Sequence, residues 1–300
     1  MIKKSFYFCL VLIFQLSVLG QVSKQPENPA LNPKKSDFQS DVVTLQLKSG
    51  LMKREMPYRV ILPFRYKSEK EKRYPVIYLL HGLTGHFNDW TDRTKISEYA
   101  TDYRFIIVMP EGGDGWYTDS TNVSNDKYES YIITELIPEI DRKFRTIANR
   151  ENQAIGGLSM GGFGAIKFGL KYPEKFALVG SFSGALGAAG WTEKEFGARG
   201  FLANSILSVF GKPESTVRIE NDIFKIVREI SADKIKNQPF IYLDCGTEDF
   251  LIKSNRDFAA LLFEKKIPHE YRQLPGGHTW VYWDKQVREF LELTEQHLKK

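Results

Sequence analysis

The chain has 300 residues, of which 42% are hydrophobic and 26% charged, and its formal net charge is +5. That charge is too small, and the lysines are too scattered, to indicate a nucleic-acid partner. The two cysteines are Cys9 and Cys245. Cys9 lies in an N-terminal segment that we expect to be removed, so the remaining chain holds a single cysteine, which excludes an internal disulfide. Cys245 lies in a strand pattern and is expected to be buried packing.

The first twenty residues, 1–20, have the pattern of a secretory signal peptide. Lys3 and Lys4 precede an apolar run that extends to Leu19, and Gly20 suits a cleavage site. The apolar run is short for a membrane span, although a retained N-terminal anchor is the alternative. Cleavage would lower the net charge to +3. We therefore expect a secreted protein, periplasmic or extracellular, with no stable membrane anchor.

The rest of the chain divides into a lead and one domain. Residues 21–40 are polar and contain three prolines, which predicts a flexible N-terminal lead. Residues 41–300 suit a single α/β domain. Helical patterns alternate with most of the strand patterns, which predicts a mainly parallel, doubly wound sheet flanked by helices. The predicted strands are 42–47, 56–62, 75–80, 105–109, 152–156, 176–182, 239–244 and 270–274.

The loop after the third predicted strand contains the sequence HGLTG. The strand itself, PVIYLL, is a continuous apolar run of the kind found in buried parallel strands. Gly82 allows the backbone to turn, so that the N–H of Leu83 can face inward and donate to a developing oxyanion. His81 is expected to brace this loop by hydrogen bonds rather than to bind a metal.

Aromatic residues follow the next strand and recur later in the chain. Trp116 and Tyr117 lie in the glycine-rich segment GGDGWYTDS, and Trp280 lies near the last predicted helix. In parallel α/β sheets, sites form at the carboxyl ends of the strands. We therefore expect these three side chains to line a substrate pocket. Residues 184–238 form a long insert whose aromatic residues either roof that pocket or build the core of a small cap.

The segment AIGGLSMGGFG, which starts at residue 154, is the most informative part of the chain. It contains Gly157-Leu158-Ser159-Met160-Gly161, the G-x-S-x-G pattern of a nucleophile elbow, between a strand pattern and a helix pattern. A serine in so tight a turn needs small neighbours. Ser159 is therefore the candidate nucleophile, and the N–H of Met160 is the second candidate oxyanion donor.

A serine nucleophile needs a base, and the base needs an orienting acid. His278 follows the last predicted strand on a loop with two glycines, whereas His269 lies within the strand and His297 lies on a polar helix. His278 is therefore the predicted base. The loop after the preceding strand, CGTED, offers Asp249 as the predicted acid. The alternatives there are the neighbouring Glu248, then Asp244, which lies at the strand end.

Six segments, taken together, resemble a known family. They are YPVIYLLHGLTGHFNDW, FIIVMPEGGDGWYTDS, YESYIITELIPEIDRKF, AIGGLSMGGFGAIKFGLKYPEKFALVGSFSG, IYLDCGTEDFL and LPGGHTWVYW, in this order across about 210 residues. With them the chain resembles the putative-esterase family of α/β-hydrolases, which includes esterase D (S-formylglutathione hydrolase), feruloyl and acetyl-xylan esterases and the antigen 85 mycolyltransferases. The resemblance implies a triad of Ser159, Asp249 and His278. It also implies an oxyanion hole formed by Leu83 and Met160.

The resemblance and the leader together predict a secreted serine carboxylic-ester hydrolase that acts through an acyl-enzyme intermediate. Its expected substrates are small-molecule or polysaccharide esters, with acetyl or feruloyl groups on plant polysaccharides as the leading class. No metal or organic cofactor is implied, and the oligomeric state stays open. Two alternatives remain: a secreted acyltransferase with the same triad, and a non-catalytic binding protein on a hydrolase scaffold. The complete set of serine, acid, histidine and oxyanion glycines argues against the second alternative.

Overall fold

The computed structural model describes residues 40–196 and 200–298. The predicted signal peptide and all but the last residue of the predicted lead lie outside the described residues. In the described part of the chain, no helix is both long enough and apolar enough to cross a lipid bilayer.

The described chain forms one eight-stranded sheet with the order β1-β2-β4-β3-β5-β6-β7-β8. β1 and β2 pair antiparallel, β2 and β4 pair antiparallel, and every later pair is parallel. The bounds are β1 Asp41–Ser49, β2 Arg54–Leu62, β3 Val76–Leu80, β4 Ile106–Pro110, β5 Gln153–Leu158, β6 Leu178–Phe182, β7 Phe240–Gly246 and β8 His269–Leu274. All eight predicted strands are therefore confirmed to within two residues at each end.

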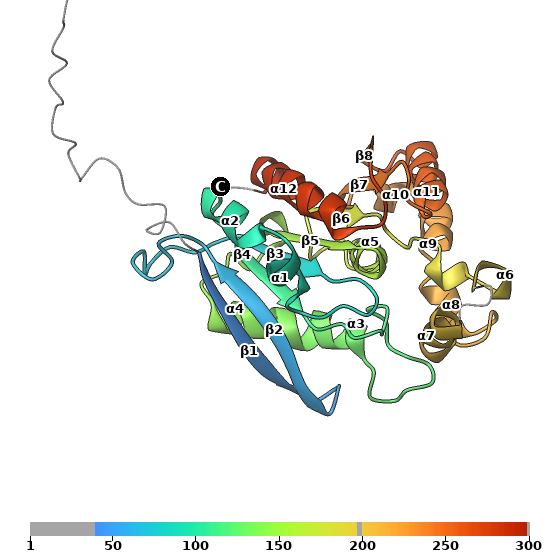
Figure 1. Cartoon of the computed structure of the whole chain (residues 1–300), viewed down its shortest axis with the longest axis horizontal. Helices are drawn as coiled ribbons and strands as arrows, with labels where there is room; N and C mark the ends of the chain where they lie inside the picture. The colour runs from blue at the N-terminus through green and yellow to red at the C-terminus, as the bar shows by residue number, and fades with distance from the viewer. Residues whose placement is uncertain (1–39, 197–199, 299–300) are drawn as a thin grey trace, which may run out of the picture. The chain divides into compact units, whose positions relative to one another are not determined.

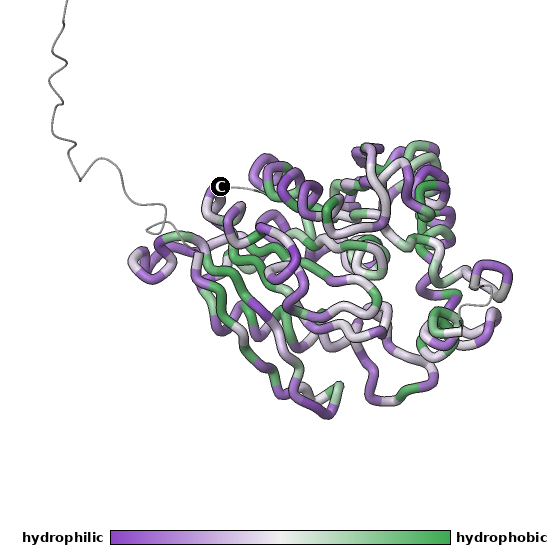
Figure 2. The backbone as a smooth tube through the Cα atoms, viewed as in Figure 1, coloured by the Kyte–Doolittle hydropathy of each residue, from purple (hydrophilic) through white to green (hydrophobic). Residues whose placement is uncertain are grey.

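The central strands are apolar on both faces because helices cover both sides of the sheet. Every residue of β3 is buried, and along it Tyr78 and Leu80 pack into one core while Ile77 and Leu79 pack into the other. The edge strand β1 instead alternates between half-buried and exposed residues. Figure 2 shows the same contrast as green central strands against a mixed periphery.

The helices form two layers around this sheet (Figure 1). One face carries α3, a π-helical segment at Tyr131–Leu136, α4, α5 and α11, and the other carries α1, α2 and α12. The bounds are α1 Asp89–Arg93, α2 Ile96–Tyr99, α3 Tyr128–Ser130, α4 Ile137–Lys143, α5 Met160–Lys171, α11 Ile252–Glu264 and α12 Trp280–His297. This is the α/β-hydrolase arrangement, and it brings the loops after β3, β5, β7 and β8 to one edge of the sheet.

The predicted insert between β6 and β7 is mostly helical, and Figure 1 shows α6 to α9 gathered beside the sheet. Buried Arg218 braces it, because its guanidinium donates hydrogen bonds to the carbonyl oxygens of Ala189, Trp191 and Gly211. The bounds are α6 Glu193–Phe196, α7 Gly200–Phe210, α8 Thr216–Glu220, α9 Ile223–Glu229 and α10 Ala232–Ile235. The insert is therefore held together by its own internal bonds.

Candidate active site

Ser159 lies at the sharp turn between β5 and α5. Its backbone angles, φ 52° and ψ −115°, fall in a region that residues with a side chain rarely adopt, so the turn is strained. Two glycines give it room. A methyl group on Gly157 would lie 2.6 Å from the carbonyl carbon of Gly161, and one on Gly161 would lie 2.6 Å from the carbonyl oxygens of Leu80 and His81. The turn therefore places the serine hydroxyl at the positive end of α5, a 12-residue helix.

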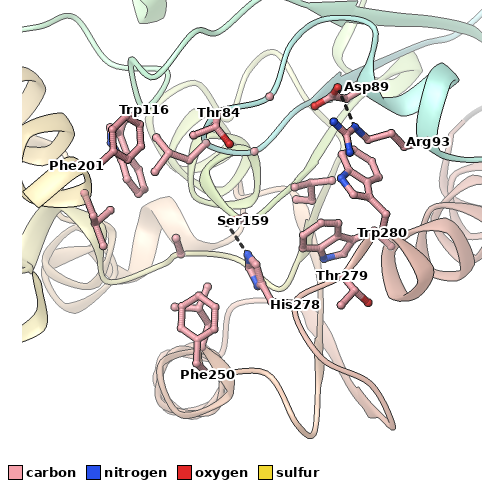
Figure 3. A pocket seen from close by; sticks show the side chains of 18 of the residues that line it. Thr84, Asp89, Arg93, Trp116, Ser159, Phe201, Phe250, His278, Thr279 and Trp280 are labelled. Atoms are coloured by element: carbon pink, nitrogen blue, oxygen red, sulfur yellow. Dashed lines mark hydrogen bonds and ion pairs between the residues drawn. The ribbon is translucent and has the colours of Figure 1, made fainter. Parts of the chain in front are cut away.

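The three residues predicted as a triad come from three loops and lie within hydrogen-bonding distance of one another. Nε2 of His278 lies 3.0 Å from Oγ of Ser159, as Figure 3 shows, and Nδ1 of His278 lies 2.9 Å from Oδ2 of Asp249. A carboxylate accepts hydrogen bonds, so Nδ1 carries a proton and Nε2 is left to accept the proton of the serine hydroxyl. The arrangement can thus activate Ser159 as a nucleophile.

Burial separates the three candidate acids. The side chain of Asp249 is fully shielded from solvent, and its Oδ1 accepts the N–H of Leu251 at 2.9 Å. Burial alone would raise the pKa of Asp249, but the hydrogen bond and electrostatic interaction with His278 outweigh it and the pKa is lowered. Glu248 is exposed. Asp244 is completely buried in β7, away from His278, and burial raises its pKa well above the usual value.

Backbone hydrogen bonds tie the acid loop to the histidine loop. The N–H of Thr247 donates to the carbonyl of Leu274, and the N–H of Glu248 donates to the carbonyl of Gly276 at 3.0 Å. The imidazole of His278 lies between two aromatic rings, with ring-centre distances of 4.8 Å to both Phe250 and Trp283. These contacts hold the imidazole in place between Asp249 and Ser159.

The two predicted oxyanion donors lie on either side of the elbow. Met160 is the first residue of α5, and Leu83 lines the same cleft as Ser159. Within the described chain, neither backbone N–H has a hydrogen-bond acceptor, so both are available to a bound oxygen. Hydrogen bonds hold the Leu83 loop: Nδ1 of His81 lies 2.8 Å from the carbonyl of Gly82.

The remaining bonds of His81 extend this brace. Its Nε2 accepts the N–H of Gly112 at 2.8 Å, and its carbonyl accepts the hydroxyl of Tyr117 at 3.0 Å. One further bond, from the N–H of Thr84 to Asp114, joins the Leu83 loop to the loop after β4. His81 therefore acts as a brace between two loops.

Ser159 and His278 open onto a cleft of about 620 Å³ (Figure 3). Trp116 and Phe201 lie on one side of the serine, and Arg93 and Trp280 lie on the other. The cleft is lined by Gly82, Leu83, Thr84, Gly85, Asp89, Arg93, Trp116, Leu158, Ser159, Ala185, Trp191, Phe201, Leu202, Phe250, Leu251, His278, Thr279, Trp280 and Trp283.

One pocket residue predicted from the sequence needs correction. Trp116 and Trp280 line the cleft, whereas Tyr117 is completely buried and is not among the lining residues. Its ring packs against Gly112 and Gly164, so it fills the core beneath the site. Trp116 is also buried but borders the cleft, a difference between neighbours that the aromatic pattern alone did not reveal.

The sequence reasoning also missed two groups that line the cleft. Phe250 follows the acid directly, and Asp89 and Arg93 occupy the short helix after the oxyanion loop. The spacing of Asp89 and Arg93, an acid four residues before a base, was a usable signal for a paired charge on a helix. Their position after HGLTG would have placed that pair near the serine.

A buried ion pair lies beneath the site. Lys167 of α5 is completely buried, and its ammonium donates hydrogen bonds to Glu129 at 2.6 Å, to the hydroxyl of Thr118 at 2.9 Å and to the carbonyl of Tyr117. A second lysine, Lys171, lies 2.6 Å from Glu129. The nucleophile helix is thereby fixed to the loop that carries Trp116.

Comparison with known proteins agrees with this geometry. Residues 49–292 match the family model described as "Putative esterase". The chain is 30% identical over 260 residues to an acetyl esterase of Caldicellulosiruptor saccharolyticus, covering 84% of this chain and 97% of that one. It is 33% identical over 242 residues to esterase Rv1288 of Mycobacterium tuberculosis, covering 74% of this chain and about half, 52%, of that protein.

A solved structure gives the same result for the fold. A ferulic acid esterase superposes with a TM-score of 0.75 at 30% sequence identity, covering 87% of this chain and 100% of the other. The family match spans the strands and loops that carry Ser159, Asp249 and His278. The chain therefore belongs to the Putative esterase family and is a serine carboxylic-ester hydrolase of the α/β-hydrolase fold.

Proposed function

We propose that the chain hydrolyses carboxylic esters through an acyl-enzyme intermediate on Ser159. The observation that carries this proposal is the chain of contacts from Oγ of Ser159 to Nε2 of His278 at 3.0 Å, and from Nδ1 of His278 to Asp249 at 2.9 Å. A hydroxyl is a weak nucleophile on its own, and an adjacent oriented base is what activates it.

In the first half of the proposed reaction, His278 takes the proton of Ser159 as Oγ attacks the ester carbonyl. The N–H groups of Leu83 and Met160 stabilise the negative oxygen of the tetrahedral intermediate. His278 then gives its proton to the departing alcohol, which leaves the acyl group on Ser159. In the second half, His278 takes a proton from water, the hydroxide attacks the acyl carbon, and Ser159 regains its proton as the acid leaves.

We further propose that the natural substrate carries acetyl or feruloyl esters on a plant polysaccharide. Two relatives are named acetyl esterase and ferulic acid esterase. One side of the cleft is aromatic, since Trp116 and Trp191 lie edge to face with ring centres 6.0 Å apart and Phe201 lines the same cleft. Flat rings suit a phenyl group or a sugar face better than a long alkyl chain.

The proposed site of action is outside the cytoplasm. Residues 1–20 have the charged start and apolar run of a secretory signal peptide. The proposal predicts that the full-length chain, expressed in a bacterial host, is recovered from the periplasm or medium without its first twenty or so residues. N-terminal sequencing of the recovered protein tests this, and an intact N-terminus in the membrane fraction would favour a retained anchor instead.

The chemistry is tested by mass spectrometry of the protein during turnover. Rapid acid quench of a reaction with 4-nitrophenyl acetate should give a protein heavier by one acetyl group, with the adduct on the peptide that contains Ser159. The Ser159→Ala protein is the control and should show no adduct. Hydrolysis by wild type without any adduct at the earliest accessible times would contradict the covalent route.

The substrate class is tested by comparing kcat/KM for acetylated xylan, methyl ferulate and 4-nitrophenyl palmitate. We expect kcat/KM for acetylated xylan or methyl ferulate to exceed that for the palmitate ester, and a clear preference for palmitate would overturn the polysaccharide assignment.

Adding a sugar alcohol acceptor and analysing the products separates hydrolysis from acyl transfer. Release of the free acid in the presence of the acceptor supports hydrolysis, whereas a sugar ester as the main product would identify a transferase.

A further inference from the structure

We propose that Arg93 forms a carboxylate-binding subsite beside the catalytic serine, so that the enzyme favours esters that carry a second, free carboxylate. The inference rests on the proposed ester hydrolysis at Ser159. Arg93 is the last residue of α1 and lines the same cleft as Ser159 and His278. Figure 3 shows it with Trp280 across the serine from the side that holds Trp116 and Phe201.

Arg93 is held in one position by two contacts. Its Nε lies 3.2 Å from Oδ1 of Asp89, four residues earlier on the same helix, and its guanidinium lies 5.6 Å from the ring centre of Trp280. Trp280 is itself fixed nearly at right angles to both Trp90 and Trp283, with ring-centre distances of 5.5 Å and 5.3 Å. A cation held in this way loses little conformational entropy when a ligand binds.

The two terminal nitrogens of Arg93 are available to a ligand. Only Nε contacts Asp89, and neither Nη1 nor Nη2 has a hydrogen-bond partner in the described chain. Its side chain is 55% exposed. The edge of a guanidinium that carries its N–H groups matches the two oxygens of a carboxylate, which makes Arg the preferred residue for such ligands.

Both carboxylate oxygens of Asp89, the acid in the same cleft, already accept hydrogen bonds from the protein. Asp89 is 11% exposed at its side chain, its Oδ1 accepts from Arg93, and its Oδ2 accepts the N–H of His86 at 3.2 Å. Among the described residues that line the cleft, Asp89 is the one carboxylate and Arg93 is the one guanidinium or ammonium group. The buried acid and the exposed cation therefore present a positive edge to a ligand, and a neutral ester leaves that edge unused.

The chemistry that fits is a carboxylate a few bonds from the ester. Two sources supply it: an acid group in the alcohol part, as in a uronic acid unit of a polysaccharide, or a free acid in the acyl part, as in a half-ester of a dicarboxylic acid. The shared requirement is a carboxylate that reaches Arg93 while the ester carbonyl lies at Ser159.

The kinetic test uses two matched ester pairs with the wild-type enzyme and with Arg93→Gln, Arg93→Lys and Arg142→Gln. 4-Acetoxybenzoate and its methyl ester place the charge in the alcohol part, whereas monomethyl and dimethyl succinate place it in the acyl part. For each pair, the selectivity is kcat/KM of the charged ester divided by kcat/KM of the neutral ester. In the pair whose carboxylate reaches Arg93, Arg93→Gln should lower this selectivity by about three- to tenfold, and Arg93→Lys should lower it by a smaller factor. Arg142 pairs with Glu139 on α4, outside the cleft, so Arg142→Gln should keep both ratios.

A binding measurement separates this inference from the proposed chemistry. In the Ser159→Ala background, titration calorimetry with 4-acetoxybenzoate and with monomethyl succinate should show that Arg93→Gln weakens the binding of at least one of them by about three- to tenfold. The subsite is wrong if Arg93→Gln changes neither dissociation constant and neither kinetic ratio. Binding that depends on Arg93 without turnover by wild type would retain the subsite and contradict ester hydrolysis.

Discussion

The α-carbon of Gly161 lies against the carbonyl oxygen of Leu80, so close that a methyl group on Gly161 would be 2.6 Å from that oxygen. Gly161 belongs to the first turn of α5, and Leu80 is the last residue of β3. Two backbone segments touch here without any intervening side chain. This contact holds the serine turn beside the loop that carries Leu83.

Gly161→Ala should therefore damage both stability and activity. Forcing a methyl group against backbone atoms typically costs about 1–3 kcal/mol, and the shift needed to relieve it moves Ser159 away from Leu83. Urea unfolding and kcat on 4-nitrophenyl acetate measure the two effects. Gly190→Ala is the matched control, because a methyl group there meets nothing within 4 Å. Equal behaviour of the two variants would contradict the role of this contact.

Ser159→Ala should abolish ester hydrolysis while the protein stays folded. Loss of the nucleophile in a comparable triad lowers kcat by on the order of 10⁶. Assays with 4-nitrophenyl acetate measure the loss, and circular dichroism with thermal unfolding checks the fold. Near-normal turnover by a folded Ser159→Ala protein would contradict the proposed role of Ser159 as the nucleophile.

Asp249→Asn should lower kcat by on the order of 10⁴, because the amide favours the wrong imidazole tautomer in a triad of this kind. Glu248→Gln changes an exposed neighbour by the same chemistry and should have a much smaller effect. The two variants are compared on one substrate at one pH. Should Glu248→Gln prove the more damaging, the orienting acid would have to be reassigned to Glu248.

Lys167→Met should destabilise the fold strongly. Removing one partner of a buried ion pair typically costs about 3–5 kcal/mol, and Lys171 would be the remaining ion-pair partner of Glu129. Lys253→Met is the control, since Lys253 pairs with Asp257 on the surface, is 84% exposed, and should contribute less than about 1 kcal/mol. Urea unfolding of the two variants and of wild type measures the loss of unfolding free energy caused by each substitution. A cost for Lys167→Met as small as that for Lys253→Met would mean that the buried pair is not needed.

The ion pair of Lys167 and Glu129 also predicts how the free energy of unfolding depends on pH. Burial alone would raise the pKa of Glu129, but Lys167 and Lys171 outweigh it and lower the pKa from 4.5 to about 2. A carboxyl group whose pKa is lower in the folded state stabilises the fold fully above about pH 4.5 and loses that contribution as the pH falls towards 2. The free energy of unfolding should therefore decrease across this window.

Glu129→Gln is the variant that tests the acid dependence. It should be less stable than wild type at neutral pH, and its free energy of unfolding should fall less steeply between about pH 4.5 and 2, because the titrating group is gone. Urea titrations at several pH values measure both slopes. Parallel slopes for the two proteins would assign the acid sensitivity to other carboxyl groups.

The strands and the order of the functional loops could be predicted from the sequence because their signals are local. A run such as PVIYLL is apolar on both faces wherever it lies, and the glycines around Ser159 reflect the backbone of that turn alone. The glycines that flank Ser159 and the two glycines before His278 identify each residue from its neighbours in the sequence. The structure places both residues, with Asp249, at one edge of the sheet.

Other features depend on contacts between distant segments and could not be predicted in this way. Glu248 and Asp249 are neighbouring carboxylic acids in the same loop, so the sequence does not distinguish them. Only the packing of this loop against the histidine loop shields Asp249 and exposes Glu248. Trp116 and Tyr117 are likewise adjacent aromatic residues, and the ring of Tyr117 fills the space beside Gly112 of its own loop and Gly164 of α5. The contribution of Arg93 to the cleft depends on a contact with Trp280, a residue far along the chain.

The bracing of the insert by Arg218 has a consequence for how such enzymes diversify. Arg218 joins parts of this segment to one another, whereas the N–H of Ala185 donates to the carbonyl of Ser159, so insert residues that contact neither group can change without disturbing the serine turn. The aromatic side of the cleft can thus change its ligand while the reaction stays the same. Grafting the insert of another esterase onto this sheet is accordingly a rational route to new substrate selectivity, provided that the bonds from Ala185 to Ser159 and from Trp116 to Ser205 are preserved.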